Sequence, residues 1–231
     1  MKVLLCSGSR PDIIRLAPVY HALRQSALEP VVLHAGHDQR ALSALYDFFE
    51  MEPALRLSLH CKRPSFAHLG SLLMEQLDQV LGRTPVAAAL VHGATAPALA
   101  LAQVACYRRV PVGHLPADLP ADSRLVPFPE GQHRAMIAAL ASWHFAATPE
   151  TVRYLQSIGC PENRIFYVRN TIVDATQWGL QHLLSYSART PTAAAAFAGD
   201  VVKRLQEGRV VLVNTHSRDL DAPALAEIAQ A

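Results

Sequence analysis

The chain has 231 residues, of which 51% are hydrophobic, 17% charged and 6% aromatic, so its core is built mainly from Ala, Val, Leu and Ile. Its 21 basic and 19 acidic residues leave a formal net charge of +2, which excludes a strongly basic nucleic-acid binder and an acidic disordered tail. No run of eighteen apolar residues occurs, so the sequence predicts no transmembrane helix. The apolar run at residues 3–6 is too short for a signal-peptide core, and we therefore expect the chain to stay in the cytoplasm.

Short apolar runs alternate with helical patterns along the chain, which predicts a doubly wound, mostly parallel α/β sheet with helices on both faces. Residues 86–91 form an unbroken apolar run, typical of a central parallel strand. In residues 66–81, leucines recur at helical spacing. In chain order, the predicted strands are 2–6, 30–34, 55–59, 86–91, 110–113, 145–148 and 165–168, and the predicted helices are 12–24, 40–49, 66–81, 97–106, 132–143 and 149–158.

The composition changes near residue 185. Residues 185–198 are rich in Ser, Thr, Pro and Ala and are interpreted as a linker that continues as a helix. A further strand at 210–213 and a helical tail at 223–231 cannot bury a core of their own. We therefore expect a Rossmann-like domain at 1–185, followed at 186–231 by a linker helix and the first strand and helix of an incomplete second domain. Such a tail packs onto the first domain, is completed by a partner, or belongs to a shortened chain.

The cysteines and histidines give little sign of a metal or disulfide framework. Four cysteines lie dozens of residues apart, and there is no CxxC and no Cys/His cluster with zinc spacing. The pair His34 and His37 has metal-ligand spacing but no third ligand nearby. We therefore expect neither a structural metal nor disulfides.

The turn after the first strand is a candidate anion site, because ligands of open parallel sheets bind outside the carboxyl ends of the strands. Gly8 and Ser9 are small, and the helix that follows offers unpaired N–H groups at its N-terminus. Arg10 and Arg15 add positive charge. With one glycine, the turn is neither a GxGxxG nor a Walker A loop. The alternative is an ordinary strand–helix turn, with Asp12 as the helix cap and Arg10 in solvent.

Other polar residues follow the later strands. His92 and His114 come directly after the fourth and fifth predicted strands, and His216 and Arg218 follow the strand at 210–213. Glu130 stands near a predicted helix start, where it is either a catalytic acid or a surface carboxylate favoured by the helix dipole. A histidine at a strand end is either catalytic or a hydrogen-bonded structural residue.

Read in order, six segments resemble the motifs of the non-hydrolysing UDP-N-acetylglucosamine 2-epimerase family. The similar segments are GSRPD at 8–12 with AP at 17–18 (GTRPE and AP), VHGAT at 91–95 (VHGDT), PVGHLPA at 111–117 (PVGHVEAG), PFPE at 127–130 with Arg134 (PxPEExNR), NTIVD at 170–174 (GNTVxDA) and NTHSR at 214–218 (TGHRRE). The resemblance covers nearly the whole chain in one register.

This resemblance implies a glycosyltransferase-B arrangement of two Rossmann-like domains, of which the chain resembles the first. It implies conversion of UDP-GlcNAc to UDP-ManNAc by elimination and re-addition of UDP, with no NAD, metal or other cofactor. Removing the C2 proton needs carboxylate bases, and UDP departure needs cationic groups. By resemblance, UDP-sugar would be bound by Gly8, Arg10, Arg15, His216 and Arg218, with Glu130 and His216 in catalytic roles.

The sequence also departs from the family pattern. The family's Asp after HG is Ala94 here, and the catalytic Glu of its HVEAG motif is Pro116. The second Glu of PEE is Gly131. We therefore expect weakened or absent epimerase activity, and at most weak binding of UDP or UDP-GlcNAc, because positioned acids and bases each contribute roughly 10²–10⁴-fold to a rate.

Three alternatives remain. One is a non-catalytic interaction or regulatory subunit that uses the Rossmann-like domain as a scaffold. Another is a working epimerase, rescued by Asp118 or Asp122 or completed by a second copy or partner chain. An NAD-dependent dehydrogenase is the least favoured, because no glycine fingerprint follows any strand.

Overall fold

The computed structural model describes residues 1–36, 39–59, 65–117 and 128–189. The chain divides into two compact units, residues 1–183 and 184–231, and the first carries the fold described below. The predicted elements after residue 189 lie outside the described residues, as do His216 and Arg218.

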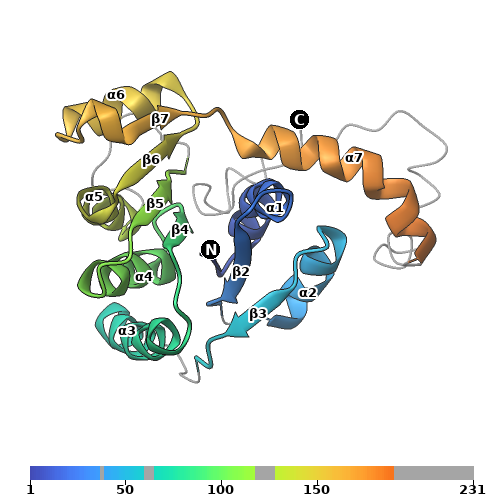
Figure 1. Ribbon diagram of the computed structural model, residues 1–231, viewed down its shortest axis with the longest axis horizontal. Coiled ribbons are helices and arrows are strands. Elements are labelled where there is room, and N and C mark those ends of the chain that lie inside the picture. Colours follow the sequence, from blue (N-terminus) through green and yellow to red (C-terminus); the bar gives the residue numbers. More distant parts are fainter. Residues whose placement is uncertain (37–38, 60–64, 118–127, 190–231) are drawn as a thin grey trace, which may run out of the picture. The chain divides into compact units, whose positions relative to one another are not determined.

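Seven parallel strands form one sheet in the order β3-β2-β1-β4-β5-β6-β7 (Figure 1). The strands are β1 (Lys2–Ser7), β2 (Glu29–His34), β3 (Pro53–Arg56), β4 (Ala88–His92), β5 (Val112–Leu115), β6 (Trp143–Ala146) and β7 (Ile165–Tyr167). The chain first winds outward from β1 to β3 and then returns to β4 on the other side of β1. This strand order confirms the predicted doubly wound, Rossmann-like fold, and it places the topological switch point between β1 and β4.

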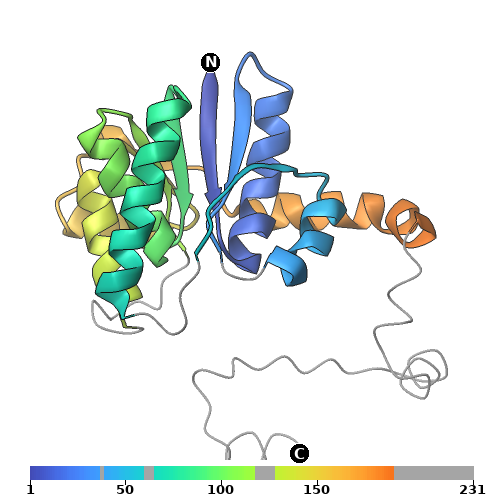
Figure 2. The ribbon, with the colours of Figure 1, turned by 90° about the horizontal axis from the view of Figure 1, so that it is seen from below.

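Helices cover both faces of the sheet. They are α1 (Arg10–Arg24), α2 (Gln39–Phe48), α3 (Phe66–Arg83), α4 (Ala96–Tyr107), α5 (Glu130–Leu140), α6 (Pro149–Ser157) and α7 (Thr171–Arg189), with a 3₁₀ turn at Glu162–Arg164. Figures 1 and 2 show α3, α4 and α5 side by side on one face and α1 and α2 on the other. The first core contains Leu73, Leu101 and Ile137, and the second contains Ile13 and Leu16. Burial of these side chains is the main stabilising contribution.

Hydroxyl side chains fix where several helices begin. Ser9, Ser65, Thr95 and Thr148 each accept a hydrogen bond from the backbone N–H three residues later. This contact satisfies a donor that the first helical turn leaves unpaired. Helix α1 also runs through Pro18, because its apolar face is held in the core. Ser9, and not Asp12, is therefore the N-cap of α1.

Most element boundaries differ from the sequence prediction by a few residues, and strand pairing explains several of these differences. Strand β3 spans Pro53–Arg56 rather than 55–59, because it pairs only with β2, and β2 ends at His34 opposite Arg56. Helix α5 ends at Leu140 rather than 143, and β6 begins at Trp143, because the Ser142 N–H already donates to the Val112 carbonyl of β5. Pairing with a neighbouring strand thus sets the limits of β3, the end of α5 and the start of β6.

Helix α7 was not predicted. It runs from Thr171 to Arg189 and so includes the first residues of the segment predicted as a linker. Trp178 of α7 packs on the face of the sheet that α1 and α2 cover. Its ring centroid lies 5.2 Å from that of His21 and 5.4 Å from that of Phe49. Tertiary packing of this kind stabilises a helix beyond what its own sequence provides.

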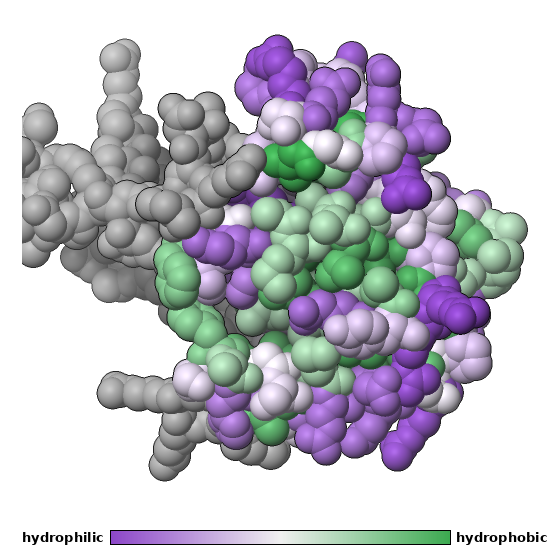
Figure 3. All heavy atoms as spheres, turned by 90° about the vertical axis from the view of Figure 1, so that its left-hand side faces the viewer, coloured by the Kyte–Doolittle hydropathy of each residue, from purple (hydrophilic) through white to green (hydrophobic). Residues whose placement is uncertain are grey.

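The face covered by α3, α4 and α5 is partly apolar. Figure 3 shows apolar residues gathered in its middle, with polar residues around them. Helix α4 has the sequence APALALAQVACY and is held between α3 and α5. None of the described helices has the length and apolar character needed to cross a membrane.

Candidate functional site

The carboxyl ends of β1, β4 and β5 bring the candidate residues to one edge of the sheet. Strand β1 leads into the Gly8–Ser9 turn, β4 ends at His92 and leads into Gly93, and β5 leads into Pro116. This edge contains the switch point, where doubly wound sheets hold their ligands.

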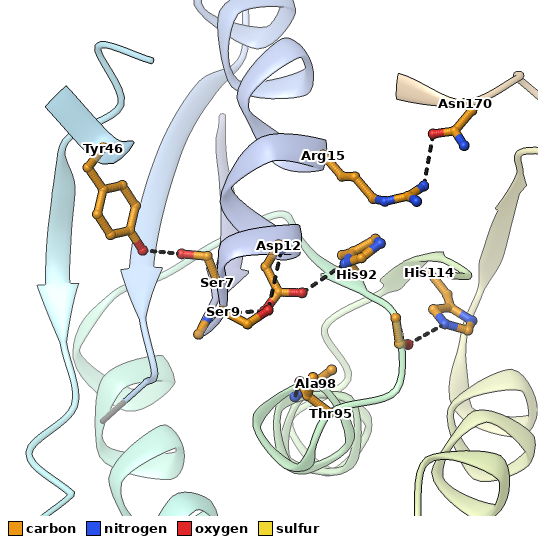
Figure 4. Close-up of polar contacts among 12 residues, drawn as sticks. Ser7, Ser9, Asp12, Arg15, Tyr46, His92, Thr95, Ala98, His114 and Asn170 are labelled. Atoms are coloured by element: carbon orange, nitrogen blue, oxygen red, sulfur yellow. Dashed lines mark hydrogen bonds and ion pairs between the residues drawn. The ribbon is translucent and has the colours of Figure 1, made fainter. Parts of the chain in front are cut away.

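Asp12 lies at the centre of this edge (Figure 4). Its Oδ2 accepts hydrogen bonds from the Gly8 N–H at 3.1 Å and from the Ser9 hydroxyl at 2.7 Å. Its Oδ1 lies 2.8 Å from His92 Nδ1, and the two side chains are 5% and 6% exposed. Asp12 therefore ties the β1–α1 turn to the end of β4, residues 80 positions apart in the chain.

The Asp12 contacts change the interpretation of the anion site. The Gly8 N–H donates to Asp12 and is therefore not free to bind an anion. Gly8 is needed for packing instead, since a Cβ there would lie 3.3 Å from the backbone of Ala35. Arg10, at the first position of α1, is exposed. Any anion at this turn would be held mainly by arginine side chains.

Arg15 lies one turn further along α1 and is half-buried. Its Nη1 donates to Asn170 Oδ1 at 2.8 Å, and Figure 4 shows the guanidinium extending toward the residues that precede α7. Asn170 is a site residue that sequence reasoning gave no role of its own. Its only signal was its place in the motif at 170–174.

The positions of the two missing carboxylates are buried. Ala94 is 5% exposed and Pro116 is also buried. The Ala94 carbonyl accepts a hydrogen bond from His133 Nδ1 at 3.0 Å, which brings the start of α5 against the β4–α4 turn. Glu130, the first residue of α5, is half-buried at this end of the helix. Gly8, Arg10, Arg15 and Glu130 thus lie on elements that meet at one edge of the sheet.

Behind the edge lies a row of buried histidines that sequence reasoning did not group. His92, His114 and His144 stand on β4, β5 and β6, and the rings of His114 and His144 lie 5.9 Å apart. His114 Nε2 donates to the Gly93 carbonyl at 2.8 Å. Arg134 of α5 is also buried, and burial lowers its pKa. A polar row of this kind is costly to charge.

Burial lowers the pKa of His114 to about 3, assisted by the nearby His144, His92 and Arg134, while the Gly93 hydrogen bond opposes the shift. The unfolded chain takes up this proton near pH 6.5, and the folded chain does so only near pH 3. Stability is therefore fully present above about pH 6.5 and is lost as the pH falls toward 3, by at most about 1.4 kcal/mol per pH unit from this residue.

We expect His114→Gln to flatten this acid dependence, because a glutamine amide can still donate to the Gly93 carbonyl but takes up no proton. Urea unfolding of both proteins at pH 7.5, 6 and 5 measures the slope. His144 and His34 also have lowered pKa values, so part of the slope remains. Identical slopes in the two proteins would show that His114 is not a source of acid sensitivity.

A series of buried side-chain hydrogen bonds supports the end of β1. The Ser7 hydroxyl lies 2.5 Å from the Tyr46 hydroxyl, which lies 2.9 Å from His34 Nδ1. Burial raises the pKa of Tyr46 to about 12. His34 is thus a core residue, and His37, the other member of the pair with metal-ligand spacing, lies outside the described residues. Within the described part of the chain, no three His, Cys, Asp or Glu residues are grouped as a metal site would need.

The fold and the position of these residues define a class. A doubly wound parallel sheet, with arginines and a buried Asp–His pair at its switch point, is a Rossmann-like α/β domain whose ligand edge is the carboxyl end of the sheet.

Within that class, the chain belongs to the UDP-N-acetylglucosamine 2-epimerase family, whose model matches residues 21–231. This confirms the family resemblance inferred from the motifs. The chain is 32% identical over 238 residues to the UDP-N-acetylglucosamine 2-epimerase of Yersinia pestis, covering 100% of this chain and 62% of that protein. It therefore spans about six-tenths of the length of the curated relatives it matches.

Solved structures of UDP-GlcNAc 2-epimerases also match the fold of this chain. The UDP-GlcNAc 2-epimerase from Neisseria meningitidis bound to UDP-GlcNAc matches 87% of this chain and 55% of its own, with a TM-score of 0.77 and 27% identity. The enzyme from Methanocaldococcus jannaschii, in complex with UDP-GlcNAc and UDP, matches 85% of this chain and 53% of its own, with a TM-score of 0.72 and 28% identity. The similarity supports the prediction that this chain resembles the first half of a two-domain fold.

Proposed function

We propose that this chain binds UDP or a UDP-sugar weakly at the carboxyl edge of its sheet and that its epimerase chemistry is weakened or lost. One observation carries the proposal: Arg10 and Arg15 of α1 lie at the switch point, whereas the positions of two expected carboxylates hold the buried, non-ionisable Ala94 and Pro116. Binding and chemistry rest on different residues, so one can persist without the other.

The binding half is supported by two kinds of observation. Arg10 and Arg15 supply positive charge beside the N-terminus of α1, which carries a partial positive charge of its own. The related structures from Neisseria and Methanocaldococcus were solved with UDP-GlcNAc, and the latter with UDP as well. A diphosphate is the part of such a ligand that these groups would hold.

The loss of chemistry follows from the reaction that the resemblance implies. Removing the C2 proton requires a base at the sugar, and each positioned acid or base contributes roughly 10²–10⁴-fold. Losing two such groups would then cost roughly 10⁴-fold or more. Glu130 is the expected catalytic carboxylate that remains. His216, proposed for catalysis and binding, and Arg218, proposed for binding, lie outside the described residues.

Proton NMR of the chain with UDP-GlcNAc in deuterated water tests both halves in one sample. We expect saturation transfer to the UDP protons, without deuterium exchange at C2 and without UDP-ManNAc or free UDP. We also expect Arg10→Gln and Arg15→Gln to weaken the contact about tenfold each, because each removes a charged hydrogen-bond donor. The exposed Arg83, at the end of α3, gives a charge-matched control in Arg83→Gln, which should bind as the parent does.

Either half of the proposal can fail separately. Exchange at C2 would show that a base survives, and Glu130→Gln would then test whether it is Glu130. Absence of saturation transfer would exclude UDP-sugar binding.

The apolar face over α3, α4 and α5 favours a second candidate, a non-catalytic subunit that associates with a second copy or a partner (Figure 3). Met136 of α5 is 44% exposed. Light scattering of the purified chain would show self-association if that face pairs with a second copy, and Met136→Glu would weaken it if Met136 lies in the contact.

A further inference from the structure

A cavity of about 520 Å³ lies at the opposite end of the strands from the ligand edge. It is formed by the C-terminal half of α5, the end of α6 and the loop before β7, beside the start of β6. Its lining consists of Ala135, Ala138, Ala139, Ala141, His144, Ser157, Ile158, Gly159, Cys160, Pro161 and Arg164. It is therefore separate from the site at the carboxyl edge.

The cavity carries a positive charge without a carboxylate in its lining. Arg164 lies on its exposed rim, and its charge lowers the pKa of both His144 and Cys160. Burial is the larger influence on each residue, lowering the pKa of His144 and raising that of Cys160. At neutral pH the cavity thus combines one cation, a neutral imidazole and a neutral thiol.

His144 lies at the inner end of the cavity. It is 1% exposed, so its ring is almost fully covered by the surrounding side chains. The carbonyl of Ala138 already accepts a long contact from the Cys160 thiol, 3.9 Å from Sγ to the oxygen.

The rest of the cavity wall is lined mainly by small side chains, which favours small ligands. Four alanines from α5 and its C-cap present methyl groups, which leave room close to the backbone. The C-terminal ends of α5 and α6 both lie in this wall, and helix C-termini favour hydrogen-bond donors. A matching ligand therefore has hydrogen-bond donors facing the two helix ends and an anionic group facing the rim.

We propose that this cavity is a second binding site, for a small hydroxylated organic anion whose carboxylate or phosphate contacts Arg164 and whose hydroxyl groups face the C-terminal ends of α5 and α6. This site is independent of UDP-sugar binding.

Two-dimensional amide NMR of the intact chain tests the site with three probes that share a six-carbon skeleton: glucose 6-phosphate, gluconate and neutral glucose. We expect the two anions to shift the amide signals of Gly159 and Cys160, which line the cavity, while glucose does not. The stronger of the two anions identifies the preferred group, phosphate or carboxylate. The amides of Gly8 and Gly93 report on the carboxyl edge in the same spectra.

Two variants of the cavity and one control make the test specific. Arg164→Gln should weaken anion binding about tenfold or more, the effect of removing a charged hydrogen-bond donor. Ala139→Leu keeps the charge but fills space at an exposed lining position, and should also weaken binding. Arg153→Gln, on the exposed side of α6 where it pairs with Glu150, removes the same charge outside the cavity and should bind as the parent does.

The proposal is overturned by any of three results: no shift of Gly159 and Cys160, equal shifts with glucose, or shifts that persist unchanged in Arg164→Gln. Shifts confined to Gly8 and Gly93 would assign the anion to the carboxyl edge alone, and so also overturn it.

Discussion

Asp12→Ala will destabilise the chain by about 3–5 kcal/mol, the usual cost of removing one partner of a buried, hydrogen-bonded pair. The alanine leaves the Gly8 N–H, the Ser9 hydroxyl and His92 Nδ1 without the carboxylate that they share. Leaving a buried donor unsatisfied costs about 1–3 kcal/mol, and His92 is buried. Urea unfolding at pH 7.5, monitored by circular dichroism, gives the change in the free energy of unfolding.

Two further variants define what the Asp12 carboxylate contributes. Asn at position 12 keeps an oxygen acceptor but cannot serve all three donors, so Asp12→Asn should lie between the parent and Asp12→Ala. Asp47→Ala removes an exposed carboxylate of α2 and should change stability by less than about 0.5 kcal/mol. If Asp12→Ala matches Asp47→Ala, the Asp12–His92 pair does not hold the β1–α1 turn to β4.

Gly36→Ala is the second change with a large expected effect. A Cβ at Gly36 would lie 2.3 Å from the Gly8 carbonyl oxygen and 3.0 Å from the Gly8 carbonyl carbon. The obstacle is backbone and cannot rotate away, so the β1–α1 turn must move. Overpacking of this kind costs about 1–3 kcal/mol, and here we expect the upper end. Because Arg10 follows that turn, the variant should also weaken any contact with UDP.

Gly70→Ala is the matched control, with the opposite expected sign. Gly70 lies inside α3, and an added Cβ would meet nothing within 4 Å. Alanine is the better helix former, so stability should rise by about 0.5–1 kcal/mol. Differential scanning calorimetry of the two variants decides the point. A neutral Gly36→Ala would mean that the Gly8 turn is free to shift, and the turn could not then be a rigid part of the site.

The site was predicted only as far as sequence position allows. Gly8, Arg10 and Arg15 follow the first strand and were assigned to the ligand edge on that ground. The partners of these residues could not be assigned in the same way. Arg15 donates to Asn170, 155 positions away, and Asp12 accepts from His92, so the interpretation of Asp12 as a helix cap was wrong. Hydrogen-bond partners so far apart leave no local pattern.

The cavity beside Arg164 also had no signal in the sequence. Its alanines and His144 belong to ordinary helix and strand patterns, and they meet only because α5, α6 and β6 pack together. The lowered pKa of His144 has the same origin, because burial depends on what covers a side chain.

The sequence by itself determined the alternation of strands and helices, and hence the doubly wound sheet, because apolar periodicity depends on neighbouring residues alone. It also determined the family, because several motifs matched in one register. Only the tertiary structure decided the strand ends, the extent of α7 and the polar contacts of Asp12. Those features depend on which distant residues become neighbours in the folded chain, and on the requirement that buried polar groups find partners there.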